Sequence, residues 1–154
     1  MLKNWGWKRA EWIRTNVSHP LVIGPDRESE QWVAEVARGA GAPFVVLEKI
    51  RKGDREVEIR FPPLDSWREN TPVLVDDIIS SGRTMIEAVV HLRKIGFAFP
   101  DCVGVHAIFA GNSYEDLIAS GAARVITCNT ISHPSNRIDV AEAFAEPLLT
   151  MLRE

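Results

Sequence analysis

Apolar residues along this chain fall into two kinds of pattern that alternate from one end to the other. Short continuous runs rich in Val, Ile and Leu, at 21–23, 73–75 and 102–109, are typical of strands that are covered on both faces of a sheet. Apolar residues at helical spacing follow two of these runs, at 32–40 and 85–95, and a glycine closes each stripe. We therefore expect an α/β fold, with a mostly parallel central sheet and helices on both faces.

Further strands are predicted by three other stretches. Residues 42–47 are expected to be a second buried strand, and 125–128 a strand nearer the end of the chain. The stretch at 57–61 instead alternates apolar and charged residues, which predicts a half-exposed strand. Together with the Gly53-Asp54 turn it predicts a charged β-hairpin flap, poorly ordered over 49–56 when no ligand is bound.

Both ends of the chain are expected to be helical. Residues 1–19 hold Trp5, Trp7 and Trp12 among Lys and Arg, and an amphipathic lead-in helix would pack these rings on the domain or on a neighbouring segment. An exposed aromatic patch in this helix would indicate a partner surface. Residues 138–152 have a helical pattern that Pro147 is expected to kink or divide.

Composition limits the class of protein. The 154 residues amount to one domain, with 45% hydrophobic and 25% charged residues. A net charge of −3 argues against a nucleic-acid binder, and no apolar run is long enough to span a membrane. The first residues are too polar for a signal peptide, so a cytoplasmic protein is expected. Cys102 and Cys128 lie in apolar runs, which favours free buried thiols over a disulfide or a metal pair.

Side chains that could bind a ligand gather where the apolar run at 73–75 ends. Asp76 and Asp77 follow the run directly, and a short loop rich in hydroxyl groups leads from them into the next helix. Such a loop lies at the carboxyl end of a strand and the amino end of a helix, where free N–H groups and the helix dipole favour an anion. The residues suited to a sugar phosphate are Ser80, Ser81, Gly82, Arg83 and Thr84.

The paired acids suit another part of the same ligand. Because carboxylates repel a phosphate, we expect Asp76 and Asp77 to hold sugar hydroxyls or a divalent cation that bridges to the ligand. The simpler alternative is that the two acids and two serines only form a strand-to-helix turn. His106, in the middle of an apolar run, is expected to be a hydrogen-bonded histidine of the core or of a pocket edge.

Residues 73–85 resemble the phosphoribosyl pyrophosphate (PRPP) motif shared by type I phosphoribosyltransferases and ribose-phosphate pyrophosphokinases. The resemblance implies that Asp76 and Asp77 hold the ribose hydroxyls, directly or through Mg²⁺, and that residues 80–84 hold the 5-phosphate. Arg83 stands where the pyrophosphokinases usually have glycine.

Two other stretches resemble the pyrophosphokinases, in the family's order along the chain. Asp26 matches the aspartate of the pyrophosphate loop, which implies a Mg²⁺ ligand, while residues 27–29 replace the usual small residues. Lys49 and Arg51 match a Lys-x-Arg in a flexible catalytic loop, which implies that they stabilise the transferring group. Without the resemblance, Lys49 and Arg51 are surface residues, and Asp26 is a turn acid or a helix cap.

The resemblance covers residues from about 21 to 144 and only the second half of such an enzyme. It implies the ribose 5-phosphate-binding domain of an enzyme of nucleotide biosynthesis, which transfers diphosphate from ATP to ribose 5-phosphate and needs an amino-terminal ATP-binding half. The expected partners are ribose 5-phosphate or PRPP, ATP, and either further copies in a homo-oligomer or that other half. A type I phosphoribosyltransferase and a non-catalytic PRPP-binding regulatory subunit are the alternatives.

Overall fold

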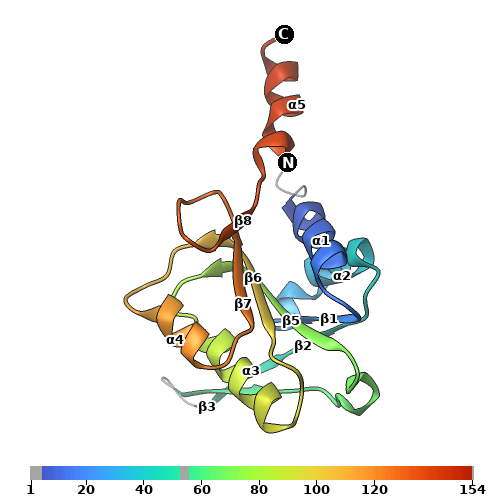
Figure 1. The fold of residues 1–154 in the computed structure, drawn as a ribbon, viewed down its shortest axis with the longest axis vertical. Coiled ribbons are helices and arrows are strands. Elements are labelled where there is room, and N and C mark those ends of the chain that lie inside the picture. The colour runs from blue at the N-terminus through green and yellow to red at the C-terminus, as the bar shows by residue number, and fades with distance from the viewer. Residues whose placement is uncertain (1–4, 53–55, 154) are drawn as a thin grey trace.

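The computed structural model describes residues 5–52 and 56–153 and contains one main sheet (Figure 1). Its six strands lie in the order β2-β1-β5-β6-β7-β8, and the neighbouring strands pair in parallel. This confirms the predicted α/β fold with a mostly parallel sheet. The strands are β1 (Pro20–Gly24), β2 (Phe44–Val46), β5 (Thr71–Ile79), β6 (Asp101–Ala107), β7 (Arg124–Cys128) and β8 (Asn136–Ile138).

The chain reverses its direction across the sheet between β1 and β5. From β1 it moves outward to β2, and it then returns to form β5 on the other side of β1 before continuing to β6, β7 and β8. Such a reversal sends the loops after two neighbouring strands to opposite faces and leaves a crevice at their carboxyl ends, where ligands bind. The turn after β1 and the loop after β5 therefore lie where a ligand site is expected.

Helices cover both faces of the sheet, as predicted (Figure 1). Two lie on each face: α1 (Trp5–Asn16) and α2 (Glu30–Ala40) on one, α3 (Arg83–Lys94) and α4 (Ser113–Ala119) on the other. Because both faces are covered, successive strand residues are apolar. Val73 joins the core beneath α1 and α2, and Leu74 joins the core beneath α3 and α4.

The tryptophan-rich lead-in is an integral part of the domain. Ile13 of α1 is fully buried in the core shared with α2, and Trp12 packs against the same core, as predicted. Trp7 stays exposed, and the side chain of Trp5 lies outside the described part of the chain.

The predicted charged hairpin forms a separate two-stranded sheet. Its strands, β3 (Glu48–Lys52) and β4 (Glu56–Arg60), are antiparallel. The Gly53-Asp54 turn lies outside the described residues. That 49–56 is poorly ordered without a ligand stays a prediction.

Two expectations from the sequence are wrong. The second strand, β2, has three residues that are only half-buried, because it lies at the edge of the sheet and not in its interior.

Ile138 belongs to β8, where it pairs with Cys128, and not to the last helix. That helix, α5 (Ala141–Met151), runs through Pro147 without being divided. Because α5 is exposed, water can satisfy the carbonyl that loses its N–H partner to the proline.

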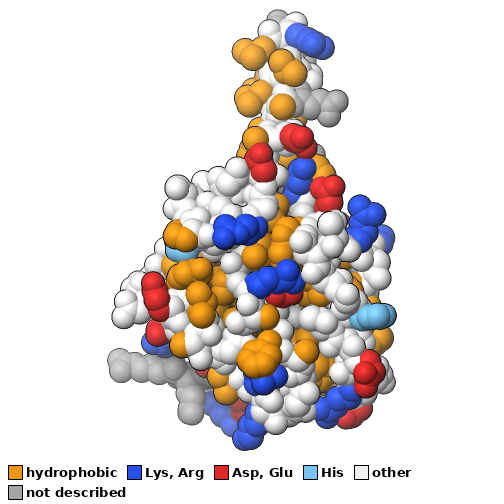
Figure 2. All heavy atoms as spheres, in the orientation of Figure 1, with side chains coloured by type: hydrophobic (Ala, Val, Ile, Leu, Met, Phe, Trp, Pro, Cys, Tyr) orange, Lys and Arg blue, Asp and Glu red, His pale blue; other side chains and the backbone are white. Residues whose placement is uncertain are grey.

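Helix α5 extends away from the body of the domain (Figure 1). Its base is tied to α1, since Lys8 Nζ lies 2.9 Å from Glu142 Oε2. Figure 2 shows apolar side chains along this helix on the molecular surface, and the exposed ones include Phe144, Leu148, Leu149 and Met151. None of the helices in the described part of the chain, α5 included, combines the length and the hydropathy needed to span a bilayer.

The two cysteines are buried and free, as predicted. Burial raises the pKa of the Cys128 thiol to about 11, and it also raises the pKa of Cys102. Both thiols are therefore protonated at neutral pH and are structural residues, not nucleophiles.

Candidate functional site

Asp26 lies in the turn that follows β1 and is fixed there by local hydrogen bonds. Its Oδ1 accepts the Ser29 N–H at 3.0 Å, and the Asp26 N–H donates to the Ser29 hydroxyl oxygen at 3.4 Å. These bonds form a capping box at the start of the short 3₁₀ helix Arg27–Ser29. Asp26 is thus a helix cap, as the simpler alternative expects, but this role uses Oδ1 and not Oδ2.

The Oδ2 atom of Asp26 contacts the charged hairpin. Lys49 Nζ lies 3.3 Å from it, which brings β3 to the carboxyl end of β1. A partly exposed pair of this kind adds little stability, so its consequence is mainly the position of Lys49. The side chain of Arg51 lies outside the described part of the chain, and its role stays a prediction.

The loop between β5 and α3 places a left-handed glycine directly before the first turn of a helix. Gly82 has a φ of 67°, a left-handed conformation that glycine adopts without strain, and α3 begins at the next residue. The Ser80 carbonyl accepts the Ala110 N–H at 3.0 Å and the Ser113 hydroxyl at 2.7 Å, which anchors the loop. Residues 80–84 line a cavity of about 120 Å³ beside the first turn of α3, whose N–H groups have no acceptor within the helix.

The side chains of the paired acids point to opposite faces of β5, because successive side chains of a strand alternate between its faces. Asp76 lies on the side of Asp26 and Lys49, whose charges both act on its carboxyl group. Asp77 lies on the side of α1, where it pairs with Arg9. A ligand placed over the end of β5 therefore meets one carboxylate on each side.

The Asp76 carboxyl is held where its negative charge is disfavoured. Burial raises its pKa; the Asp77 N–H, which donates to Asp76 Oδ1 at 2.8 Å, opposes this shift. The charge of Asp77 and, more weakly, that of Asp26 raise the pKa further, while Lys49 lowers it. A bound cation would relieve this repulsion.

These carboxylates fit Mg²⁺ in one particular way. Among the described residues, no group of three or more His, Cys, Asp or Glu side chains could hold a metal ion. Mg²⁺, however, usually keeps several waters and binds through one or two carboxylates together with substrate phosphates. Asp26 and Asp76 provide two carboxylates on one side of β5, so they fit a Mg²⁺ ion that is shared with a phosphate ligand.

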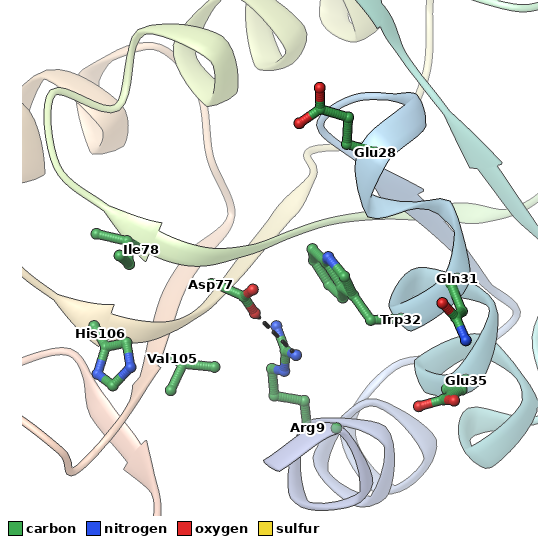
Figure 3. A pocket seen from close by; sticks show the side chains of 10 residues that line it. Arg9, Glu28, Gln31, Trp32, Glu35, Asp77, Ile78, Val105 and His106 are labelled. Atoms are coloured by element: carbon green, nitrogen blue, oxygen red, sulfur yellow. Dashed lines mark ion pairs between the residues drawn. The ribbon is translucent and has the colours of Figure 1, made fainter. Parts of the chain in front are cut away.

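A larger cavity, of about 540 Å³, adjoins Asp77 (Figure 3). Arg9 reaches it from α1, with Nη2 3.3 Å from Asp77 Oδ1, and its Nη1 donates to the Asp76 carbonyl at 3.1 Å. The Trp32 ring of α2 lies beside the guanidinium group, with its centroid 4.8 Å from Arg9 Cζ. The other side chains around the cavity are mixed: Glu28, Gln31, Glu35, Ile78, Val105 and His106.

His106 is a hydrogen-bonded histidine at a pocket edge, as predicted. It is half-buried, and its Nδ1 lies 2.8 Å from the Thr130 hydroxyl oxygen. The same hydroxyl donates to the Val105 carbonyl at 3.3 Å. These contacts hold the loop after β7 against β6.

Arg9 is the candidate that the sequence did not single out. Its signal is its place in α1, where it shares the buried stripe of Ile13 and Val17 at intervals of one helical turn. A charged residue is almost never fully buried unless it is paired, so Arg9 in that stripe indicates a partner. The partner, Asp77, lies in another element, and the sequence does not reveal it.

A sheet that reverses beside β1, with paired acids and a glycine-containing loop after β5, is the arrangement of the type I phosphoribosyltransferase fold. Residues 7–144 match the family described as the phosphoribosyl transferase domain, and the chain belongs to that family. The match begins within α1 and ends within α5, so it includes all strands of the main sheet.

Curated relatives carry the name ribose-phosphate pyrophosphokinase. The protein from Methanopyrus kandleri is 38% identical over 126 residues, which cover 82% of this chain and 43% of that protein. The protein from Sulfurisphaera tokodaii is 34% identical over 134 residues, which cover 86% of this chain and 46% of that protein. The chain thus spans about half the length of the curated relatives it matches.

Solved structures share the fold. The phosphoribosylpyrophosphate synthetase from Mycobacterium smegmatis has a TM-score of 0.74 at 21% identity, with 98% of this chain and 50% of that chain covered. The orotate phosphoribosyltransferase from Aeropyrum pernix has a TM-score of 0.55 at 19% identity, with 79% and 67% covered. At these identities the likeness shows the fold alone, and it confirms the expected type I phosphoribosyltransferase-like fold.

Proposed function

We propose that this chain is the ribose 5-phosphate-binding part of a ribose-phosphate pyrophosphokinase, which transfers diphosphate from ATP to ribose 5-phosphate. The observation that carries the proposal is the meeting of Asp26, Lys49, Asp76 and the 80–84 loop at one end of the sheet. The name of the curated relatives supports the same activity.

In this proposal the acceptor sugar lies over the end of β5. The 5-phosphate binds in the 80–84 loop, through backbone N–H groups, the hydroxyls and the cation of Arg83. Asp76 and Asp77 accept hydrogen bonds from the ribose hydroxyls from opposite sides. The acids and the loop thus hold the two ends of one small molecule.

The hairpin and the metal act on the transferring group. Lys49 and Arg51 stabilise the negative charge that spreads over its oxygens, and movement of β3 and β4 over the site excludes water. Asp26 and Asp76 are the residues that would hold Mg²⁺ with the phosphate ligand. When bound, the ion supplies positive charge to the phosphate oxygens.

The ATP site is proposed to come from an amino-terminal half, for which the remaining length of the curated relatives leaves room. Transfer of this kind depends mostly on positioning the two substrates in line. We therefore expect this chain alone to bind ribose 5-phosphate but to form little PRPP from ATP.

Titration calorimetry with ribose 5-phosphate and with PRPP, with and without Mg²⁺, tests the proposal. We expect binding that Mg²⁺ strengthens, and a loss of about tenfold or more in Asp76→Asn, because a hydrogen bond to a charged group is lost. Glu69→Gln, which also removes one negative charge but is exposed at the opposite end of β5, is the control and is expected to bind normally. No binding of either ligand would remove the proposal, and rapid PRPP formation by the chain alone would contradict the need for another half.

A further inference from the structure

Arg9 is a buried arginine that reaches from α1 to the two acids at the end of β5. Only 4% of its side chain is exposed, and its two Nη atoms contact Asp77 Oδ1 and the Asp76 carbonyl. Pairing between β1 and β5 ends at Ile23 and Leu74, so β5 continues beyond its neighbour on this side. Arg9 supplies a partner to this last part of the strand (Figure 3).

Stability alone does not explain this arginine. Its Nε is buried with no hydrogen-bond partner among the described residues, although Trp32 lies beside the guanidinium group. Replacing a buried ion pair with well-packed apolar residues is often neutral or stabilising, because burying charge is costly. A planar guanidinium group does, however, fix the direction of its partners better than any other cation does.

The geometry of Asp77 leaves room for a ligand. The ion pair uses Oδ1, and 56% of the Asp77 side chain is still exposed beside the cavity. The Arg9 contact to the Asp76 carbonyl fixes the backbone immediately before Asp77. Arg9 therefore restrains both the backbone and the carboxylate of this acid.

We propose that Arg9 is a positioning residue that orients Asp77 so that its exposed oxygen accepts a hydrogen bond from a ribose hydroxyl. The inference rests on the proposed function, in which Asp77 holds the sugar. Arg9 does not touch the ligand in this arrangement. It acts on the hydroxyl end of the sugar, while the 80–84 loop binds the phosphate end independently.

The test compares two ligands by calorimetry: ribose 5-phosphate and 2,3-dideoxyribose 5-phosphate, which lacks the hydroxyls that the acids hold. In Arg9→Met we expect the preference for ribose 5-phosphate to fall about tenfold, the value of one hydrogen bond to a charged group, with the affinity for the dideoxy sugar unchanged. Arg14→Met, the same substitution at an exposed position of α1, is the matched control and should keep the preference. In an Asp77→Asn background, Arg9→Met should have little further effect.

Each outcome has a distinct meaning. An Arg9→Met variant that keeps the full preference, or that loses both ligands equally, overturns the inference, because a merely structural role would not separate the two sugars. Arg9→Lys keeps the positive charge but lacks the planar guanidinium group, and we expect it to show an intermediate preference for ribose 5-phosphate. If Arg9→Met does not fold, Arg9→Lys replaces it in the test. A full preference in Arg9→Lys overturns the inference. A wild-type chain that binds neither sugar phosphate removes the proposed function itself. A wild-type chain that prefers ribose 5-phosphate leaves the proposed function standing whatever the Arg9 variants do.

Discussion

Asp76 links folding to binding through one carboxyl group. Burial raises its pKa, and the charges of Asp77 and Asp26 add to the shift. A carboxyl whose pKa is higher in the folded state stabilises the fold fully below its unfolded pKa, and this stabilisation is lost as the pH rises through the folded pKa. As the pH rises and Asp76 ionises in the folded state, the free energy of unfolding therefore falls, and we infer that the site keeps this carboxyl group for the ligand.

We expect Asp76→Asn to raise the unfolding temperature at neutral pH while it weakens sugar phosphate binding. The increase in unfolding temperature should shrink towards about pH 3, where the Asp76 carboxyl of the wild type is protonated in the folded and the unfolded state. Thermal unfolding followed by circular dichroism at both pH values measures the effect, with Glu69→Gln as the control. A variant that is less stable than the wild type at neutral pH would contradict this account.

At the scale of residues, the sequence predicts what directly follows a strand and misses what crosses between elements. Asp26, Asp76 and the 80–84 loop follow apolar runs, and parallel strands bring their ends to one edge of the sheet. The partners of Asp77 depend on how α1 packs. Its ion pair with Arg9 joins elements far apart in the chain, and no local pattern encodes such a contact.

At the scale of elements, the turn after β1 depends on a glycine. A Cβ atom at Gly24 would lie 2.6 Å from Val33 Cγ2 and 2.9 Å from Ser29 Oγ. These neighbours belong to α2 and to the capping box that fixes Asp26. The close packing of strand, turn and helix thus leaves no space for a larger residue.

We expect Gly24→Ala to lower the free energy of unfolding by about 1–3 kcal/mol, the usual cost of overpacking a core. Urea unfolding measures this change. Gly6→Ala is the control, because its added Cβ would lie 3.6 Å from Val36 Cγ2, an ordinary contact, and alanine favours the helix. An unchanged urea midpoint in Gly24→Ala would show that the turn can adapt.

The predicted elements agree with the structure where the apolar pattern is long and closed by a turn residue. Helix α2 ends before Gly41, which has a φ of 66°, as its stripe predicts. The pattern fails near the C-terminus because Ile138 is buried as part of β8, where it pairs with Cys128. Its spacing to the apolar residues that follow matches a helix only by coincidence. The edge position of β2 depends on how the strands pack in three dimensions, and the short apolar run at 42–47 contains no signal for it.

At the scale of the whole molecule, the alternation of strands and helices predicts a parallel sheet with both faces covered. The hydrophobic pattern does not express the strand order, so it does not predict that the chain reverses between β1 and β5. The direction in which α5 leaves the domain is not encoded by either, because nothing in the described residues packs along most of its length (Figure 1).

We expect the chain to self-associate, since Trp7 on α1 and several large apolar side chains on α5 are exposed. Light scattering at tens of micromolar measures the mass. A variant with Leu148→Glu and Leu149→Glu places charge on α5 without touching the core and should lower the mass if α5 takes part. A monomeric wild type would contradict the expectation.

The exposed position of α5 also has a kinetic consequence. A helix of 11 residues is marginal in water by itself, because isolated helices shorter than about 12–15 residues barely form, and Pro147 removes one of its hydrogen bonds. Its amide hydrogens should therefore exchange with deuterium rapidly in a dilute sample, and far more slowly once another surface covers the helix. The amides of β5, between β1 and β6, should be protected in both conditions. Deuterium uptake at 141–151 would thus report on assembly while the sheet itself stays unchanged.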